Sequence, residues 1–184
     1  MTLTMVGEAP KGNEGPRKGK GIQPGDRAPD FTLLDQENVP TRLQDQLGKG
    51  PLIVYFYPKD ETPGCVAEAC LFRDHYSDFQ SLGAEVFGIS SDSPDTHRAF
   101  CKHHRIPFRL LSDPGGKVRS LWGVPKTLRI FPGRVTYVLD AEGIVRHVVV
   151  SQSQPRKHLE EALKVIRQMP KADTVRTTFT AHQD

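Results

Sequence analysis

Residues 52–70 have the sequence LIVYFYPKDETPGCVAEAC, which combines an apolar run, a proline-containing loop and two cysteines. Its first six residues, Leu52–Tyr57, are apolar and rich in β-branched and aromatic side chains, which predicts a buried strand that stops at the following proline. Thr62 followed by Pro63 has the pattern of a helix N-cap with proline at the first helical position. We therefore predict a strand, a short loop and a helix whose first turn contains Cys65.

A cysteine in the first turn of a helix lies near the positive end of the helix dipole, where a thiol loses its proton more easily and becomes a nucleophile. Cys65 would also follow the carboxyl end of a strand, which is where open α/β sheets place their functional sites. The Thr62 hydroxyl is close enough in sequence to hydrogen-bond a thiolate or a bound oxygen species. Arg73 and Arg134 are candidate charge partners, and the sequence alone places neither beside Cys65.

Cys70 follows Cys65 by five residues. In an intact α-helix, residues five apart have Cα atoms roughly 8–9 Å apart, whereas a disulfide needs them within about 7 Å. The two cysteines can therefore bond only if the first turns of the helix unwind. A small buried thiol without redox function is the alternative for Cys70, but its position beside Cys65 favours a redox pair.

Cys101 lies in the next predicted helix, where an incidental, half-buried thiol is the favoured interpretation. Helical spacing puts His97 on the same face, and His103 and His104 follow, so these four residues raise the question of a metal site. No Cys-x-x-Cys or His-Glu-x-x-His pattern supports one. We predict no metal and no other cofactor.

The remaining elements alternate along the chain, which predicts an α/β fold with a central mixed sheet covered by helices on both faces. The expected strands are Phe31–Leu34, Leu52–Tyr57, Glu85–Ser90 and Phe108–Leu111, followed by a hairpin of Val135–Leu139 and Ile144–Val150. The expected helices run from Thr62 to about Leu82, from Ser93 to about His104, over Lys117–Trp122, and from Pro155 to Met169.

Length and composition bound the function. A chain of 184 residues favours one domain, which we place at residues 21–170, between a disordered N-terminal arm (1–20) and a flexible C-terminal tail (171–184). A net charge of +3 is too small to indicate nucleic acid as a partner, and no stretch approaches the ~20 apolar residues of a membrane span. Three cysteines are typical of a reducing compartment, so we expect a cytoplasmic protein or one in an equivalent compartment supplied with reductant.

The sequence resembles the bacterioferritin-comigratory-protein, or peroxiredoxin Q, branch of the peroxiredoxins, over about residues 21–168. The Pro-x3-Thr-x2-Cys pattern that Pro58, Thr62 and Cys65 form is highly specific for this family. The matching segments are Gly25–Phe31, Tyr55–Cys65, Glu68–Cys70, Phe72–Asp74, Ser90–Asp92, Pro107–Phe108, Leu111–Asp113 and Arg134–Asp140.

The resemblance implies a thioredoxin-like fold and assigns a role to five residues. Cys65 matches the peroxidatic cysteine, and Thr62 matches the hydroxyl that orients it and the peroxide. Pro58 matches the proline that shields the pocket, and Arg134 matches the arginine that stabilises the thiolate and the transition state. Cys70 matches the resolving cysteine of the common form of this branch.

The same resemblance implies an antioxidant, thiol-specific peroxidase that reduces hydrogen peroxide and organic hydroperoxides and is recycled by thioredoxin. Members of the branch are often monomeric. Some members resolve with a cysteine in the following helix, so Cys101 stays an alternative to Cys70. A protein thiol-disulfide oxidoreductase would share the fold, but such enzymes normally carry the Cys-x-x-Cys pattern that is missing here.

Overall fold

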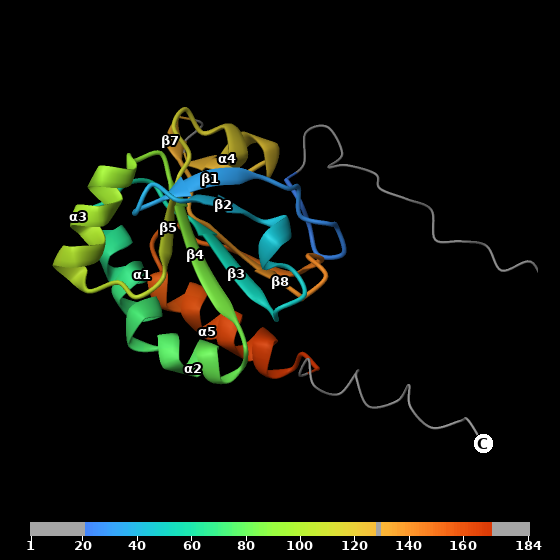
Figure 1. Cartoon of the computed structure of the whole chain (residues 1–184). Helices are drawn as coiled ribbons and strands as arrows, with labels where there is room; N and C mark the ends of the chain where they lie inside the picture. The colour runs from blue at the N-terminus through green and yellow to red at the C-terminus, as the bar shows by residue number, and fades with distance from the viewer. Residues whose placement is uncertain (1–20, 128–129, 171–184) are drawn as a thin grey trace, which may run out of the picture.

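The computed structural model describes residues 21–127 and 130–170. The predicted N-terminal arm and C-terminal tail lie outside the described residues. Within the described part, a seven-stranded mixed sheet has the strand order β2-β1-β5-β4-β3-β8-β9 (Figure 1). The strands are β1 (Thr32–Asp35), β2 (Pro40–Arg42), β3 (Leu52–Phe56), β4 (Glu85–Ser90), β5 (Arg109–Ser112), β8 (Val135–Leu139) and β9 (Val145–Val150). A separate pair consists of β6 (Lys126–Thr127) and β7 (Phe131–Pro132).

The central strand β3 is buried along its whole length. It pairs in parallel with β4 on one side and antiparallel with β8 on the other. Strands with neighbours on both sides and helices above and below have no solvent-facing side, which is why the Leu52–Phe56 run is continuously apolar rather than alternating. The expected mixed sheet is confirmed.

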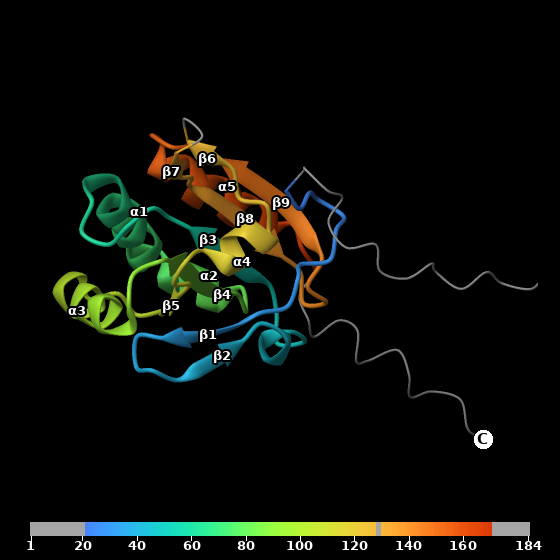
Figure 2. The same ribbon diagram turned by 90° about the horizontal axis from the view of Figure 1, so that it is seen from above.

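Helices cover both faces of the sheet, as predicted (Figure 2). One face packs against α1, α2, α3 and α5, through side chains such as Phe72, Phe79, Phe100 and Leu159. The opposite face packs against α4 and the N-terminal segment, which is residues 21–31 before β1. Trp122 is fully buried among their side chains. The helices are α1 (Pro63–Asp74), α2 (Tyr76–Ser81), α3 (Pro94–His104), α4 (Lys117–Leu121) and α5 (Pro155–Arg167).

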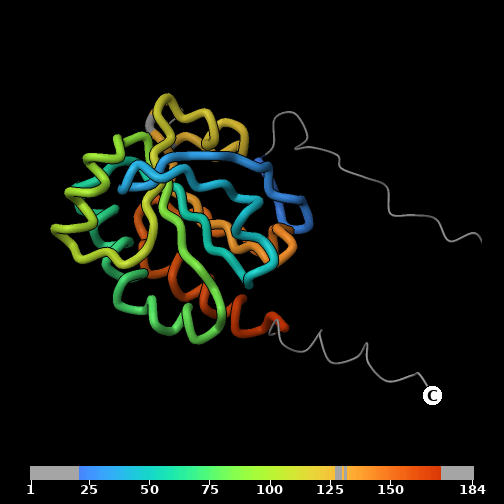
Figure 3. The backbone as a smooth tube through the Cα atoms, in the orientation of Figure 1, coloured from blue at the N-terminus to red at the C-terminus, as the bar shows by residue number. Residues whose placement is uncertain are grey.

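The N-terminal segment closes the second face by running alongside α4, two regions that are far apart in the sequence (Figure 3). The Ile22 N–H donates to the Trp122 carbonyl at 3.1 Å. The Trp122 indole N–H in turn donates to the Pro29 carbonyl at 3.1 Å. These bonds explain why a segment that precedes the first strand is ordered and belongs to the core.

Two expectations need correction. The single helix expected from Thr62 to about Leu82 is two helices, because His75 leaves the helical conformation (φ −109°, ψ 12°) and its ring contacts the Asp78 carboxylate at 2.9 Å. The sequence analysis also missed β2, β6, β7 and a 3₁₀ turn at Gln44–Gln46. These elements have two or three residues each, which is too short for a recognisable hydrophobic period.

Candidate active site

Cys65 lies in the first turn of α1, directly after the loop that leaves β3, as the sequence predicts. Thr62 is the N-cap and Pro63 the first helical residue, and the Thr62 carbonyl accepts the Val66 N–H at 2.9 Å. The Thr62 hydroxyl makes no capping bond and instead donates to the Lys59 carbonyl at 2.8 Å. The Cys65 side chain is almost fully buried, with 1% of its surface exposed.

Arg134, not Arg73, is the guanidinium beside the thiol. Its Nη2 donates to the Cys65 sulfur at 3.2 Å, across 69 residues of sequence. The antiparallel pairing of β3 with β8 causes this contact, because Phe56 pairs with Val135 and so puts Arg134 at the point where the chain leaves β3. Arg73 points elsewhere and donates to the His104 carbonyl at 2.7 Å.

Gly64 makes room for this guanidinium. A β-carbon at position 64 would lie 3.1 Å from Nη2 of Arg134, which is closer than ordinary van der Waals contact. The absence of a side chain therefore allows the Arg134 guanidinium to reach the sulfur of the next residue. The glycine of the Thr62–Cys65 motif has a steric role that the sequence pattern alone did not reveal.

Glu68 is a third charged member of the site, and the sequence analysis gave it no role. It lies three residues after Cys65, so both side chains project from the same face of α1, and its carboxylate pairs with Nη1 of Arg134. The Glu68 side chain is fully buried, and this desolvation raises its pKa to about 7, although the positive charge of Arg134 acts in the opposite direction.

His158 from α5 lies behind Glu68. Its Nε2 is 2.8 Å from the Ser151 carbonyl and must carry the proton, so its Nδ1 accepts the Thr136 hydroxyl proton at 2.8 Å. Burial lowers the pKa of His158, which agrees with this neutral form. Nδ1 lies 3.6 Å from Oε1 of Glu68 and offers it no proton, and Oε1 has no hydrogen-bond partner within residues 21–127 and 130–170. The lack of a donor at Oε1 is consistent with the raised pKa of Glu68.

Arg119 holds together the two chain segments that form the site. Its guanidinium donates to the carbonyls of Tyr57 at 2.7 Å and of Gly133 at 2.6 Å, which follow β3 and precede Arg134, respectively. The same group lies over the Phe56 ring, 5.5 Å from its centroid. Burial lowers the pKa of Arg119. No sequence signal singled out this residue, because its role depends on the pairing of β3 with β8.

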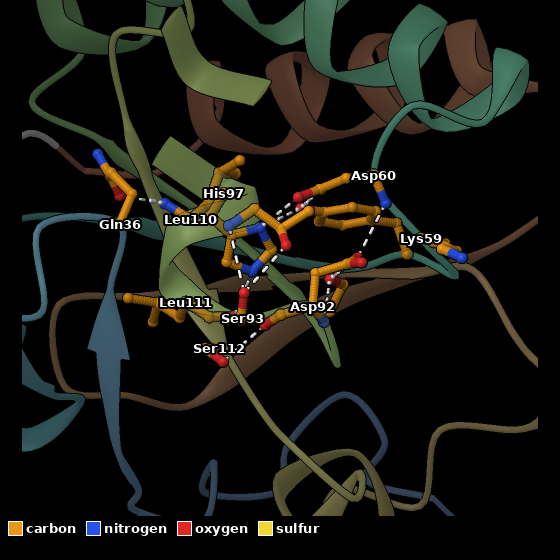
Figure 4. Close-up of polar contacts among 12 residues, drawn as sticks. Gln36, Lys59, Asp60, Asp92, Ser93, His97, Leu110, Leu111 and Ser112 are labelled. Carbon is orange, nitrogen blue, oxygen red and sulfur yellow. Dashed lines mark hydrogen bonds and ion pairs between the residues drawn. The ribbon is translucent and has the colours of Figure 1, made fainter. Parts of the chain in front are cut away.

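A buried polar network anchors the loop between β3 and α1 to helix α3 (Figure 4). Asp60 accepts the Tyr57 hydroxyl at 2.6 Å and contacts Nδ1 of His97 at 2.7 Å. The Asp60 N–H donates to the Asp92 carboxylate at 2.9 Å. His97, which the sequence analysis considered as a metal ligand, therefore points inward, away from His103 at the exposed end of α3.

The other cysteines differ in their surroundings. Cys70 is half-buried in the same continuous helix as Cys65, so their Cα atoms are roughly 8–9 Å apart, and no disulfide can form without local unwinding. Cys101 is half-buried on α3, and burial, reinforced by the charge of Asp60, raises the pKa of its thiol to about 12. Pro58, the remaining predicted site residue, lies half-buried in the loop after β3.

A mixed sheet of this strand order, with a thiol at the start of the helix after its central strand, defines a thioredoxin-fold thiol enzyme. Within that class, the chain belongs to the AhpC/TSA family, whose profile matches residues 24–148. It is a peroxiredoxin of the Q branch, and hence a thiol-dependent peroxidase, as comparisons with individual relatives show.

The chain is similar to Peroxiredoxin Q, chloroplastic, from Sedum lineare, with 52% identity over 149 residues that cover 80% of each sequence. The protein of the same name from Arabidopsis thaliana is 50% identical over 147 residues, covering 79% of this chain and 68% of the relative. Among solved structures, Peroxidoxin BcpB from Mycobacterium tuberculosis has a TM-score of 0.75 at 36% identity, covering 81% of this chain and 99% of the other. No helix of the described residues is long and apolar enough to cross a membrane.

Proposed function

We propose that Cys65 is the peroxidatic residue and that its thiolate attacks one oxygen of a hydrogen peroxide or organic hydroperoxide molecule. The O–O bond breaks, the sulfur becomes a sulfenic acid, and the leaving oxygen takes up a proton and departs as water or an alcohol. The observation that carries this proposal is the 3.2 Å contact between the Cys65 sulfur and the Arg134 guanidinium. A fixed cation there stabilises the thiolate and the charge that develops on the oxygens in the transition state.

Three further elements complete the proposed site. The backbone N–H groups of the first turn of α1 have no partners within the helix and are the proposed donors to an oxygen of the peroxide. The Thr62 hydroxyl orients the peroxide after turning away from the Lys59 carbonyl, and Pro58 shields the sulfur from bulk water. We propose no metal or organic cofactor for this step.

In the second step, Cys70 attacks the sulfenic sulfur, a disulfide forms, and water leaves. The start of α1 must unwind for this reaction, because the intact helix holds the two Cα atoms too far apart. Cys101 is the less suitable resolving residue, since a thiol with a pKa of about 12 is almost entirely protonated at neutral pH. A dithiol protein such as thioredoxin then reduces the disulfide, and the enzyme acts as a monomer in antioxidant defence, in the cytoplasm or another reducing compartment.

Peroxide consumption coupled to a thioredoxin system tests the first step. Cys65→Ser should abolish turnover, because Cys65 is the thiol that the Arg134 guanidinium contacts at 3.2 Å and serine cannot supply the attacking sulfur. Near-normal turnover in Cys65→Ser would refute the assignment of Cys65.

Mass spectrometry of the peroxide-treated protein distinguishes the two candidate resolving cysteines. We expect a Cys65–Cys70 disulfide in the wild type and in Cys101→Ser. In Cys70→Ser we expect the disulfide to be lost and Cys65 to be over-oxidised to the sulfinic acid. A Cys65–Cys101 disulfide that forms at the normal rate in Cys70→Ser would instead identify Cys101 as the resolving residue.

A further inference from the structure

Glu61, His103 and His104 come together at the surface where the loop before Cys65 meets the end of α3. Oε1 of Glu61 lies 3.1 Å from Nδ1 of His103, and Oε2 lies 3.0 Å from Nε2 of His104. Both histidines are more than 40 residues away from Glu61 in the sequence. Glu61 and His103 are exposed, and His104 is partly covered, so dissolved ions have access to the cluster.

We propose that Glu61, His103 and His104 form a binding site for a divalent transition-metal ion such as zinc. Zinc binds imidazole nitrogens and carboxylate oxygens at distances near 2.1 Å, so two ligands of one ion lie roughly 3.0–3.5 Å apart. The two nitrogen–oxygen distances fall in this range, and the ligand atoms of all three residues lie within 4.8 Å of one another. Water molecules complete the coordination.

The ligands are held in place before an ion binds. The His104 ring packs against the buried Phe100, with 4.7 Å between ring centroids, and Arg73 fixes the His104 carbonyl. The His103 and His104 rings lie together, with centroids 4.3 Å apart. Both belong to the last turn of α3, where the negative end of the helix dipole favours a cation.

The buried cluster of Asp60, Asp92 and His97 offers ligand atoms at similar spacing but is not a comparable site. Its carboxylate oxygens already accept the Tyr57 hydroxyl, the Ser90 hydroxyl and the Asp60 N–H. An ion there would have to replace bonds that anchor the loop. Only the exposed cluster combines two imidazoles with a carboxylate that has no other hydrogen-bond partner within the described residues.

An ion at this site would join the loop before Cys65 to α3, because Glu61 is the residue next to the N-cap Thr62. The proposed disulfide step requires this end of α1 to unwind. Bound metal is therefore expected to slow the formation of the Cys65–Cys70 disulfide, a consequence that rests on the proposed function, whereas the binding site itself does not.

Calorimetric titration with zinc chloride tests the site. The full-length chain carries Cys65→Ser, Cys70→Ser and Cys101→Ser, so that thiolates do not compete for zinc. We expect one ion per chain, and a loss of affinity of at least about tenfold in His103→Asn, His104→Asn or Glu61→Gln, since even residues outside the coordination shell contribute that much. His147→Asn, which removes one histidine from a similar His–Glu pair, should leave the affinity unchanged. The absence of saturable binding, or an affinity that His103→Asn does not alter, would overturn the proposal.

Cobalt(II) absorption of the chain with its native thiols gives a second measurement that does not depend on the cysteine substitutions. We expect nitrogen–oxygen ligand-field bands that disappear in His103→Asn; bands that persist there would contradict the site.

The rate of disulfide formation after a peroxide pulse, with and without zinc, tests whether bound metal slows the unwinding of α1. Zinc should slow disulfide formation in the wild type more than in His103→Asn. Equal slowing of the two proteins would exclude regulation through this site. If the wild type showed no peroxide consumption that depends on Cys65, the proposed function would be refuted. The zinc site would be unaffected by that result, because the zinc titration does not measure peroxidase activity.

Discussion

The Cys65 sulfur shares its guanidinium partner with a carboxylate. Arg134 donates to the sulfur through Nη2 and pairs with Glu68 through Nη1. The carboxylate fixes the orientation of the guanidinium, but its negative charge also offsets part of the field that stabilises a thiolate. Because the pKa of Glu68 is raised to about 7, its charge changes in the pH range in which peroxidases act.

Removing the guanidinium should slow the reaction of Cys65 with peroxide. We expect Arg134→Gln to lower the second-order rate constant for peroxide about 10²–10³-fold, the usual effect of losing one donor to a developing negative charge. Stopped-flow measurement of Cys65 oxidation gives this rate. Arg146→Gln is the matched control and should leave the rate unchanged, because Arg146 forms a half-exposed ion pair with Asp140 in the turn between β8 and β9. Equal rates for the wild type and Arg134→Gln would show that the contact has no catalytic role.

At the level of elements, α1 and α3 start differently. The hydroxyl of Ser93 accepts the Thr96 N–H and caps α3, whereas the Thr62 hydroxyl makes no such bond to α1. A side-chain cap contributes about 1 kcal/mol to a helix, so the first turn of α1 lacks a stabilising contact that α3 has. The helix that must unwind in the proposed disulfide step is the one without the cap. Its loop is held instead by Asp60, through Tyr57 and His97.

The Asp60 network should therefore contribute strongly to stability. Asp60→Ala leaves a buried hydroxyl and a buried imidazole without their acceptor, and each such loss costs about 1–3 kcal/mol. We expect the free energy of unfolding in urea to fall by roughly 2–6 kcal/mol. Asp95→Ala removes an exposed ion pair with Arg98 within α3. It should change the free energy of unfolding by less than about 1 kcal/mol. A loss for Asp60→Ala no larger than that for Asp95→Ala would contradict the anchoring role.

In the whole molecule, the site receives residues from the helices on both faces of the sheet. Arg134 directly precedes β8, Glu68 comes from α1 and His158 from α5, and Arg119 comes from α4 on the opposite face. The global stability of the fold should consequently depend on the protonation of a group inside the site.

Glu68 is that group. Its pKa is raised from 4.5 to about 7 in the folded state, so its protonated form stabilises the fold below about pH 4.5, and this stabilisation is lost as the pH rises through about 7. A shift of this size corresponds to roughly 3 kcal/mol. We expect the unfolding free energy of the wild type, minus that of Glu68→Gln, to fall by roughly 3 kcal/mol as the pH rises from about 4.5 to above 7. Urea unfolding at several pH values measures this difference.

Glu161→Gln provides a control of opposite sign. The pKa of Glu161 is lowered, mainly by the hydrogen bond with His147. The contribution of Glu161 to stability is therefore present above its ordinary pKa and is lost as the pH falls. A difference curve for Glu68→Gln that is flat, or that has the sign expected for Glu161→Gln, would show that burial does not dominate at Glu68.

The sequence by itself determined the local features. The apolar run Leu52–Tyr57, the Thr62-Pro63 start of α1 and the position of Cys65 in its first turn all depend on side-chain periodicity and capping preferences, which act between near neighbours. The resemblance carried by the motif pointed to the peroxiredoxin family, which the comparisons show. Residue chemistry limited the charge partners of Cys65 to Arg73 and Arg134, and the family resemblance then favoured Arg134.

The tertiary structure explains why Arg134 and not Arg73 contacts Cys65, because strand pairing decides which distant residue lies beside the end of β3. Strand pairing and helix packing likewise brought Arg119 and His158 to the site and Glu61 to the histidines of α3. These contacts join residues far apart in the chain, and no local pattern records them. Burial, which only the complete fold creates, is what raises the pKa of Glu68 beside Arg134 and Cys65.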